Sequence, residues 1–222
     1  MSKTSSVPRS DKTRNRLLKT TEAIFANRGF SGLTLREVAQ RSQTNLASTH
    51  YHFGSKEAMV LEMLKTRVKP INVKRLKYLE EAKLKANGKL LTTKEILRAL
   101  ILPIGEEIAK SSHTRQTLAQ LVARTFTEPV RFIEKMHRKF FEELCEIFMD
   151  ELRRTHPHTS DEDLYWNLHL AISSMLGALA QHRRLSDFSK GKCNEEDTHN
   201  MIERLVIFTS HGFEAGIASQ TS

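Results

Sequence analysis

Residues 44–56 gather side chains that can donate hydrogen bonds to an anion or to the edges of nucleic-acid bases. The stretch reads Thr-Asn-Leu-Ala-Ser-Thr-His-Tyr-His-Phe-Gly-Ser-Lys. Its small or polar residues Ala47, Ser48 and His50 permit a close approach, while Tyr51 and His52 are longer donors. Phosphate oxygens accept hydrogen bonds from hydroxyl, amide and ammonium groups, and side chains of these types contact base edges. This pattern favours a nucleic-acid contact.

Catalysis and metal binding are the competing chemistries. His50 and His52 are two residues apart, which places them on different sides of a helix and argues against a shared metal. Glu134 and His137 are spaced as in di-iron bundles, but a second such pair is not evident. The sequence shows no Gly-rich phosphate loop, no Gly-x-Ser-x-Gly and no His-Glu-x-x-His. We therefore expect no metal, no cofactor and no enzymatic activity.

The charge distribution supports an anionic partner. The chain of 222 residues carries a net charge of +9. Residues 1–60 hold ten Lys and Arg against four Asp and Glu, a net charge of +6, while residues 61–222 hold 25 against 22, a net charge of +3. Such an asymmetry indicates a basic, anion-binding head on a nearly neutral body. A solvated basic face is the alternative that charge alone leaves open.

Helices must position these side chains, because the apolar residues repeat with a helical period almost throughout the chain. The head is predicted to hold three helices, at about 11–28, 34–41 and 45–52. The last two, joined by a short polar turn, have the spacing of a helix-turn-helix, in which the second helix enters the major groove.

Capping residues mark the boundaries of these helices. Thr34 and Glu37 fit a capping box, and Asn45 is a favourable N-cap. Gly29 and Gly54 are expected to end their helices, because glycine adopts a positive φ without a clash. Ser55 caps a long fourth helix, in which Pro70 is expected to start a kink or a new helix.

The body is also predicted to be helical. A helix from about residue 94 is expected to be interrupted or ended by Pro103 and Gly105. Further helices are predicted at about 114–126, 130–152, 164–185 and 195–218, with a polar loop at 186–194 and Asn194 as the last N-cap. The fold class is therefore all-α, with a small head and a larger body.

Residues 13–63 resemble the DNA-binding domain of the TetR family of bacterial transcription regulators. The resemblance lies in Phe25-Ala-Asn-Arg-Gly-Phe30, in Thr34-Leu-Arg-Glu-Val-Ala39, and in Asn45-Leu-Ala-Ser-Thr-His-Tyr-His-Phe-Gly-Ser-Lys-Glu57. The chain departs from the family at Gln43-Thr44, where many members have Gly-Val, which puts the turn geometry in question. The implied domains are a flexible basic arm at 1–10, a DNA-binding domain at 11–70 with the helix-turn-helix at about 34–53, and a body at 71–222 that binds an effector and dimerises.

The resemblance implies a role for each matched position. Thr34 and Lys56 would hold phosphates, Tyr51 and His52 would contact backbone or base near the rim, and the groove would be faced by Thr44, Asn45, Leu46, Ala47, Ser48 and His50. The implied partner is a double-stranded, near-palindromic operator. Twofold symmetry would place two recognition helices about 34–36 Å apart in successive major grooves.

The resemblance also implies that the body forms a homodimer and binds a small effector. The apolar helices at about 164–185 and 195–218 are expected to form a four-helix interface with their copies. Candidate effector contacts are the aromatic, methionine and other unusual residues of the body: Leu121, Phe126, Met136, Phe140, Trp166 and His169. The motif ending in Tyr51-His-Phe-Gly-Ser-Lys56, together with Trp166-x-x-His169, is similar to regulators of fatty-acid metabolism. This implies a fatty acid or acyl-CoA, with a drug-like aromatic compound as the alternative.

Several alternatives stay open. The regulator would be a repressor or an activator, and a structural DNA-binding protein is the competing class. Two cysteines cannot form a disulfide framework or a four-thiolate zinc site, and Cys193 is a candidate redox-sensitive thiol. The longest apolar run, residues 99–104, falls short of the roughly 20 residues of a transmembrane helix, and the polar N-terminus lacks the apolar core of a signal peptide. We therefore expect no membrane contact and a cytoplasmic location.

Overall fold

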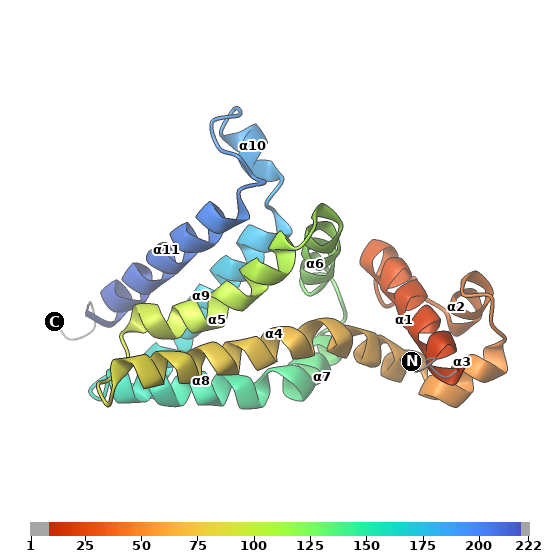
Figure 1. Cartoon of the computed structure of the whole chain (residues 1–222), viewed down its shortest axis with the longest axis horizontal. Helices are drawn as coiled ribbons and strands as arrows, with labels where there is room; N and C mark the ends of the chain where they lie inside the picture. Colours follow the sequence, from red (N-terminus) through yellow and green to blue (C-terminus); the bar gives the residue numbers. More distant parts are fainter. Residues whose placement is uncertain (1–8, 219–222) are drawn as a thin grey trace, which may run out of the picture. The chain divides into compact units, whose positions relative to one another are not determined.

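The structure is a computed structural model that describes residues 9–218, and every regular element in that range is a helix (Figure 1). The predicted all-α fold class is confirmed. The helices are α1 (Arg9–Arg28), α2 (Leu35–Arg41), α3 (Leu46–Phe53), α4 (Lys56–Ala86), α5 (Thr93–Ala109), α6 (Ser112–Arg124), α7 (Val130–Phe140), α8 (Glu142–Thr155), α9 (Asp161–Ala180), α10 (Arg184–Phe188) and α11 (Thr198–Ala218). Most of the predicted arm, residues 1–8, lies outside the described residues, and Arg9 and Ser10 belong to α1.

The chain divides into two compact units, with the boundary between Val68 and Lys69. The first unit, called the head below, holds α1, α2, α3 and the first part of α4. The second unit, the body, holds the rest of α4 and helices α5 to α11. Helix α4 is continuous through the boundary, so it is the covalent and helical link between the two units.

The core of the head forms where the apolar periodicity predicts it. The inward side of α1 is buried at five positions with helical spacing: Leu17, Leu18, Thr21, Ile24 and Phe25. Two ion pairs join α1 to α4, Arg14 Nη2 to Glu62 Oε1 at 2.7 Å and Arg67 Nη2 to Glu22 Oε2 at 2.7 Å. The head is therefore held by an apolar centre with charged pairs at its edge.

The predicted helix ends of the head are confirmed, with one exception. Gly29 and Gly54 adopt φ values of 69° and 73°, and the Ser55 hydroxyl accepts from the Ala58 amide at 3.1 Å. Thr34 Oγ1 accepts from the Glu37 amide at 3.2 Å. The return half of the predicted capping box is absent at α2, because the Glu37 carboxylate pairs instead with Arg28 and Arg41. These cations lower the pKa of Glu37, the Arg28 hydrogen bond being the main cause.

Proline does not break either helix in which the sequence predicted an interruption. Pro70 lies inside α4, and the carbonyl left without a donor belongs to exposed Thr66, where water can satisfy it. Pro103 and Gly105 lie inside α5, which continues to Ala109. Gly105 marks a close helix crossing, because a Cβ at this position would lie 2.4 Å from Cγ1 of Ile202 on α11.

The centre of the body is built from α5, α9 and α11, with α6 and α8 packed on them. Four further boundaries differ from the predicted ones. The helix predicted at 130–152 is divided at Phe141 into α7 and α8. The helix predicted at 164–185 begins at Asp161 and ends at Ala180. The loop predicted at 186–194 contains part of α10. The last helix begins at Thr198, where Asp197 Oδ1 rather than Asn194 accepts from the Asn200 amide at 3.0 Å.

Among the helices of the described residues, none combines the length and the apolar character needed to cross a membrane.

Candidate functional site

Helix α3 presents an exposed face that its own N-cap holds in place. Asn45 Oδ1 accepts from the Ser48 amide at 2.6 Å, which fixes the first turn. Thr49 points inward and is fully buried. The opposite face exposes Asn45, Leu46, Ala47, His50 and Tyr51, and Tyr51 is 85% exposed. The structure therefore brings the predicted contact residues of α3 onto one solvent-facing surface, with Ser48 half-buried at its side.

The turn between α2 and α3 contains Gln43-Thr44, where many members of the TetR family have Gly-Val. Gln43 adopts φ = 51°, the left-handed conformation that glycine favours. Thr44 is half-buried, and its Oγ1 lies 3.1 Å from Ser42 Oγ and 3.4 Å from the Ala39 carbonyl. The turn thus holds a glutamine in the left-handed conformation and a threonine hydroxyl that bonds within the protein.

The remaining predicted contact residues flank this surface. Thr34 is exposed at the start of α2, while His52 is half-buried with its ring 5.4 Å from the Tyr51 ring. His50 Nδ1 lies 3.1 Å from the Gly54 carbonyl. The Lys56 ammonium lies 4.3 Å from the centre of the Phe30 ring, a cation–π contact that holds it at the start of α4.

A row of basic residues on α1 is a feature that sequence reasoning missed. Lys12, Arg16 and Lys19 are exposed on one face, with Asn15 between them, and together line a shallow depression. We call these four residues the α1 basic row. Arg16 Nη2 donates to the Gln43 carbonyl at 3.4 Å, which places the row beside the turn that precedes α3. The helical spacing of the three cations is a signal that could have found it.

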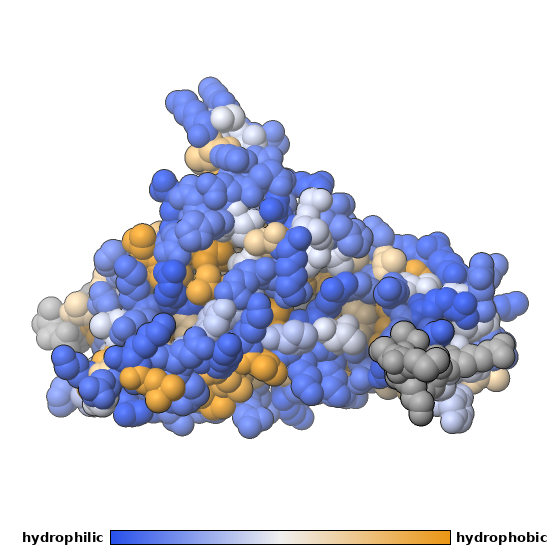
Figure 2. Space-filling view, viewed as in Figure 1, coloured by the Kyte–Doolittle hydropathy of each residue, from blue (hydrophilic) through white to orange (hydrophobic). Residues whose placement is uncertain are grey.

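The body carries an apolar surface on α9 and α11. Trp166 and Leu170 on α9, and Ile207 and Phe208 on α11, are exposed, and we call these four residues the α9–α11 apolar face. The two helices pack on each other. In Figure 2, hydrophobic side chains reach the surface over the stretch where Figure 1 places α11. An apolar surface of this kind is typical of an interaction site.

The six predicted effector residues lie on or beside α6, α7 and α9 and differ widely in burial. Leu121 is buried in α6, Phe126 is 62% exposed beyond its end, and Met136 and Phe140 are half-buried in α7. Trp166 is 60% exposed and His169 is also exposed on α9. Their helical spacing could not distinguish buried from exposed faces in helices that are apolar on several sides.

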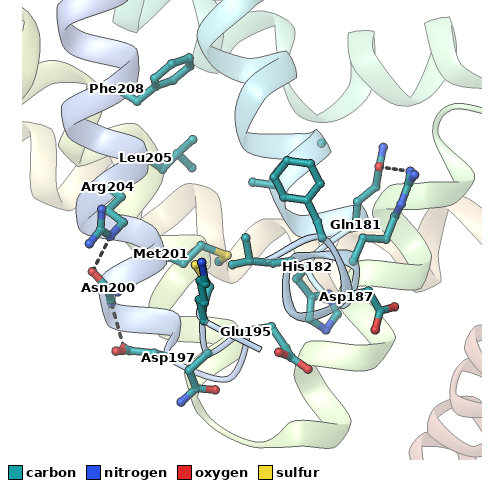
Figure 3. Close-up of a pocket in the computed structure, with 18 residues that line it drawn as sticks. Gln181, His182, Asp187, Glu195, Asp197, Asn200, Met201, Arg204, Leu205 and Phe208 are labelled. Carbon is teal, nitrogen blue, oxygen red and sulfur yellow. Dashed lines mark hydrogen bonds between the residues drawn. The ribbon is translucent and has the colours of Figure 1, made fainter. Parts of the chain in front are cut away.

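A groove of about 1110 Å³ lies elsewhere in the body, between the end of α9, α10 and the first half of α11. Met201, Leu205 and Phe208 line it from α11, and His182 lines it from the segment after α9 (Figure 3). Arg204 Nε donates to Asn200 Oδ1 at 2.9 Å along one wall. None of the six predicted effector residues lines this groove.

The candidate metal ligands and the two cysteines are all placed by the structure. Within residues 9–218, no group of three or more His, Cys, Asp or Glu side chains could hold a metal ion. Both cysteines are free thiols, with Cys145 half-buried and Cys193 exposed. Burial raises the pKa of Cys145, which keeps it protonated at neutral pH and makes it a weak nucleophile.

A helix-turn-helix with an exposed second helix, linked by one long helix to an all-helical body, defines a DNA-binding transcription regulator. Residues 17–63 match the family described as bacterial regulatory proteins, tetR family, and residues 98–212 match the tetracyclin repressor-like C-terminal domain. The chain belongs to the TetR family, as the sequence motifs predicted.

Individual relatives are distant. The chain is 32% identical over 54 residues to the HTH-type transcriptional repressor NicS of Pseudomonas putida, a match that covers 24% of this chain and 26% of NicS. The crystal structure of NalD, the secondary repressor of a multidrug efflux pump in Pseudomonas aeruginosa, superposes with a TM-score of 0.59, at 22% identity over 88% of this chain and 96% of NalD. The fatty acid degradation regulator FadR of Bacillus halodurans gives a TM-score of 0.54 at 10% identity, over 87% of this chain and 94% of FadR. At these identities, the solved structures share the fold.

Proposed function

We propose that the protein is a repressor that binds a near-palindromic operator as a homodimer and is released when a small hydrophobic effector binds to the body. The observation that carries the proposal is the face of α3, which exposes Leu46, Ala47, His50 and Tyr51 around the Asn45 cap. A recognition helix needs such a face to reach base edges in the major groove. The repressor names of NicS and NalD support the direction of regulation, and an activator is the alternative.

Each predicted contact residue has a role in this proposal. Leu46, Ala47, Ser48 and His50 face the bases, and Tyr51 and His52 contact the rim. Thr34, Lys56 and the amides at the start of α3 contact phosphates, and the α1 basic row adds further phosphate contacts. Asn45 and Thr44 act mainly by holding the turn and the first turn of α3, because their side chains bond within the protein.

Binding to DNA is tested by selecting duplexes from a random pool and measuring their affinity by fluorescence anisotropy. We expect a twofold-symmetric site whose half-sites are separated by one helical turn or a multiple of it. Tyr51→Ala should weaken binding at least about tenfold, since one hydrogen bond to a charged group is worth about 1.5–3 kcal/mol. Tyr165→Ala, at an exposed tyrosine of the body, is the matched control. Equal affinities of the two variants would remove the assignment of α3.

The homodimer is proposed to form through the α9–α11 apolar face, with helices α9 and α11 of each chain in a four-helix contact. Gly212 on α11 supports this geometry, because the space around its missing Cβ is empty and lets a second helix approach closely. Analytical ultracentrifugation should find a dimer, and Phe208→Glu should shift it to a monomer that binds a half-site weakly. A Phe208→Glu dimer as stable as the parent would place the interface elsewhere.

The effector is proposed to bind within residues 71–222, and residues 11–70 are proposed to bind DNA. A fatty acid or acyl-CoA is the first candidate, and a drug-like aromatic compound is the second; the names of FadR and NalD fit these two candidates respectively. Mass spectrometry of small molecules that copurify with the protein distinguishes them. A coupling free energy of about 1–3 kcal/mol between effector and operator would be enough for a useful switch.

A further inference from the structure

Arg75 is a buried cation in the interior of the body. It lies on α4 and is only 5% exposed. Burial of the guanidinium lowers its pKa to about 10, and the one titratable neighbour that acts on it among the described residues is the Cys145 thiol. Buried arginines are normally compensated by a carboxylate, because an isolated charge in an apolar interior costs several kcal/mol.

Arg75 has more N–H donors than good acceptors around it. Nε donates to the Leu100 carbonyl at 2.8 Å and Nη1 to Asn72 Oδ1 at 3.1 Å. Nη2 reaches only the Met175 sulfur, at 3.9 Å. A guanidinium has five N–H donors, and the edge formed by Nη1 and Nη2 matches a carboxylate in bidentate geometry. The protein occupies this edge with one amide oxygen and a thioether, both neutral.

Arg98 gives an internal comparison for this arrangement. Its Nη1 and Nη2 atoms donate to the two carboxylate oxygens of Glu203 at 2.7 and 2.6 Å. That bidentate pair compensates an arginine that is much more exposed than Arg75. The more deeply buried arginine of the two is thus the one that has no carboxylate partner.

The groups that accept from Arg75 are all neutral: the Leu100 carbonyl, the Asn72 amide oxygen and the Met175 sulfur. Met175, on α9, is an unbranched side chain that can change rotamer and vacate the Nη2 position. Asn72 Nδ2 donates to the Phe140 carbonyl at 2.7 Å, which brings the end of α7 next to the same cluster. Asn72, Phe140 and Cys145 are half-buried, so the cluster approaches the surface near the break between α7 and α8.

We propose that Arg75 is the anchor for the carboxylate of a monocarboxylic acid whose apolar body lies between α4, α7, α8 and α9. The acid is held by two N–H donors of the guanidinium and displaces the Met175 sulfur. The inference rests on the proposed function only where it names this ligand as the effector. Binding of the acid to Arg75 can be measured on the protein without DNA.

Calorimetry with matched acids and alcohols tests the charge requirement on the unaltered protein. The probes are decanoate below its micelle concentration and decan-1-ol, for an aliphatic source, and phenylacetate and 2-phenylethanol, for an aromatic one. We expect at least one acid to bind about 10–150-fold more tightly than its alcohol, the range expected for a hydrogen-bonded charge. Equal affinity of acid and alcohol in both pairs, or no binding by either acid, would overturn the proposal.

Substitution at Arg75 locates the site. Arg75→Met keeps an unbranched, flexible apolar stem and removes the guanidinium with its charge. It should abolish the preference for the acid while leaving binding of the alcohol unchanged. Arg75→Lys should retain part of the preference, because the charge stays but the bidentate edge is lost. Arg98→Met is the control, and it should bind the acid like the parent. Undiminished acid binding by Arg75→Met would refute the anchor.

Melting in the absence of ligand provides a readout that separates a ligand anchor from a structural residue. An anchor imposes its desolvation cost on the empty protein, so Arg75→Met should melt at the same temperature as the parent or higher. A loss of several degrees, with acid binding unchanged, would assign Arg75 to the fold alone. Affinity for the operator, measured without ligand, tests the proposed function separately and should be unaffected.

Discussion

Replacement of Gln43 by glycine should stabilise the head, although it removes a side chain. Gln43 sits at φ = 51°, where the Cβ of an L-residue crowds the neighbouring backbone at a cost of about 1–2 kcal/mol. Glycine removes this strain but loses about 0.5–1 kcal/mol through the greater freedom of the unfolded chain. The Gln43 side chain is exposed, so little packing is lost. The net expectation for Gln43→Gly is a gain of about 0.5–1 kcal/mol.

Gln40→Gly is the matched control for this prediction. It makes the same chemical change three residues earlier, at an exposed position within α2. There the backbone is helical, so glycine should cost about 1 kcal/mol. Urea denaturation followed by circular dichroism should therefore move the midpoints of the two variants in opposite directions. A loss of stability in Gln43→Gly as large as that in Gln40→Gly would refute the left-handed turn and the account of how this chain replaces the family's glycine.

Three further outcomes are expected. Arg16→Gln should make the slope of log affinity against log salt less steep, by about 0.9 for each phosphate that Arg16 neutralises. Lys77→Gln, a control in the body, should leave the slope unchanged. Equal slopes for the two variants would remove the α1 basic row from the interface. Gly105→Ala should destabilise the body by about 1–3 kcal/mol, because the new Cβ would lie 2.4 Å from Ile202 Cγ1. The double variant with Ile202→Ala should lose less stability than the sum of the two single losses. Strictly additive losses in thermal melts would contradict the clash. Glu203→Gln should lower the free energy of unfolding by less than about 1 kcal/mol at pH 7, because both partners of the Arg98–Glu203 pair are partly exposed. The Arg98 hydrogen bond lowers the pKa of Glu203, so the stabilisation by this pair is present above the ordinary pKa of 4.5 and is lost as the pH falls through the pKa of the folded state. In strong acid the variant should therefore be as stable as the parent.

The head could be predicted almost residue by residue because its signals are local. A cap such as Asn45 acts on an amide three residues away, and Gly54 acts on its own backbone, so the sequence alone determines both. The capping box predicted at Glu37 shows the limit of local signals. The same carboxylate could close a capping box or pair with Arg28, and Arg28 comes within reach only through the fold.

The body could be predicted only as a set of helices. Pro103 does not break α5, because packing on both sides of a buried helix outweighs the local cost of one missing donor. The candidate effector residues were chosen by type, and type does not tell the buried Leu121 from the exposed Trp166. Arg75 gave no signal, because arginine in a sequence indicates a surface, and only the packing of α4, α5 and α9 around it shows that it is buried.

Helix α4 gives a physical reason why an anion at Arg75 could regulate a distant site. The same helix supplies Met63 to the core of the head and Arg75 to the interior of the body. The two residues are twelve positions apart in the same helix. Pro70 lies between them and removes one backbone hydrogen bond, so bending is less costly there than elsewhere in α4. One charged hydrogen bond is worth about 1.5–3 kcal/mol, which matches the 1–3 kcal/mol that a useful coupling requires. A single carboxylate would therefore suffice as the switch, provided that it binds Arg75 in only one of two positions of α4. This predicts that Arg75→Met retains affinity for the operator but is no longer released by the acid, whereas a variant that is still released would place the switch on other residues.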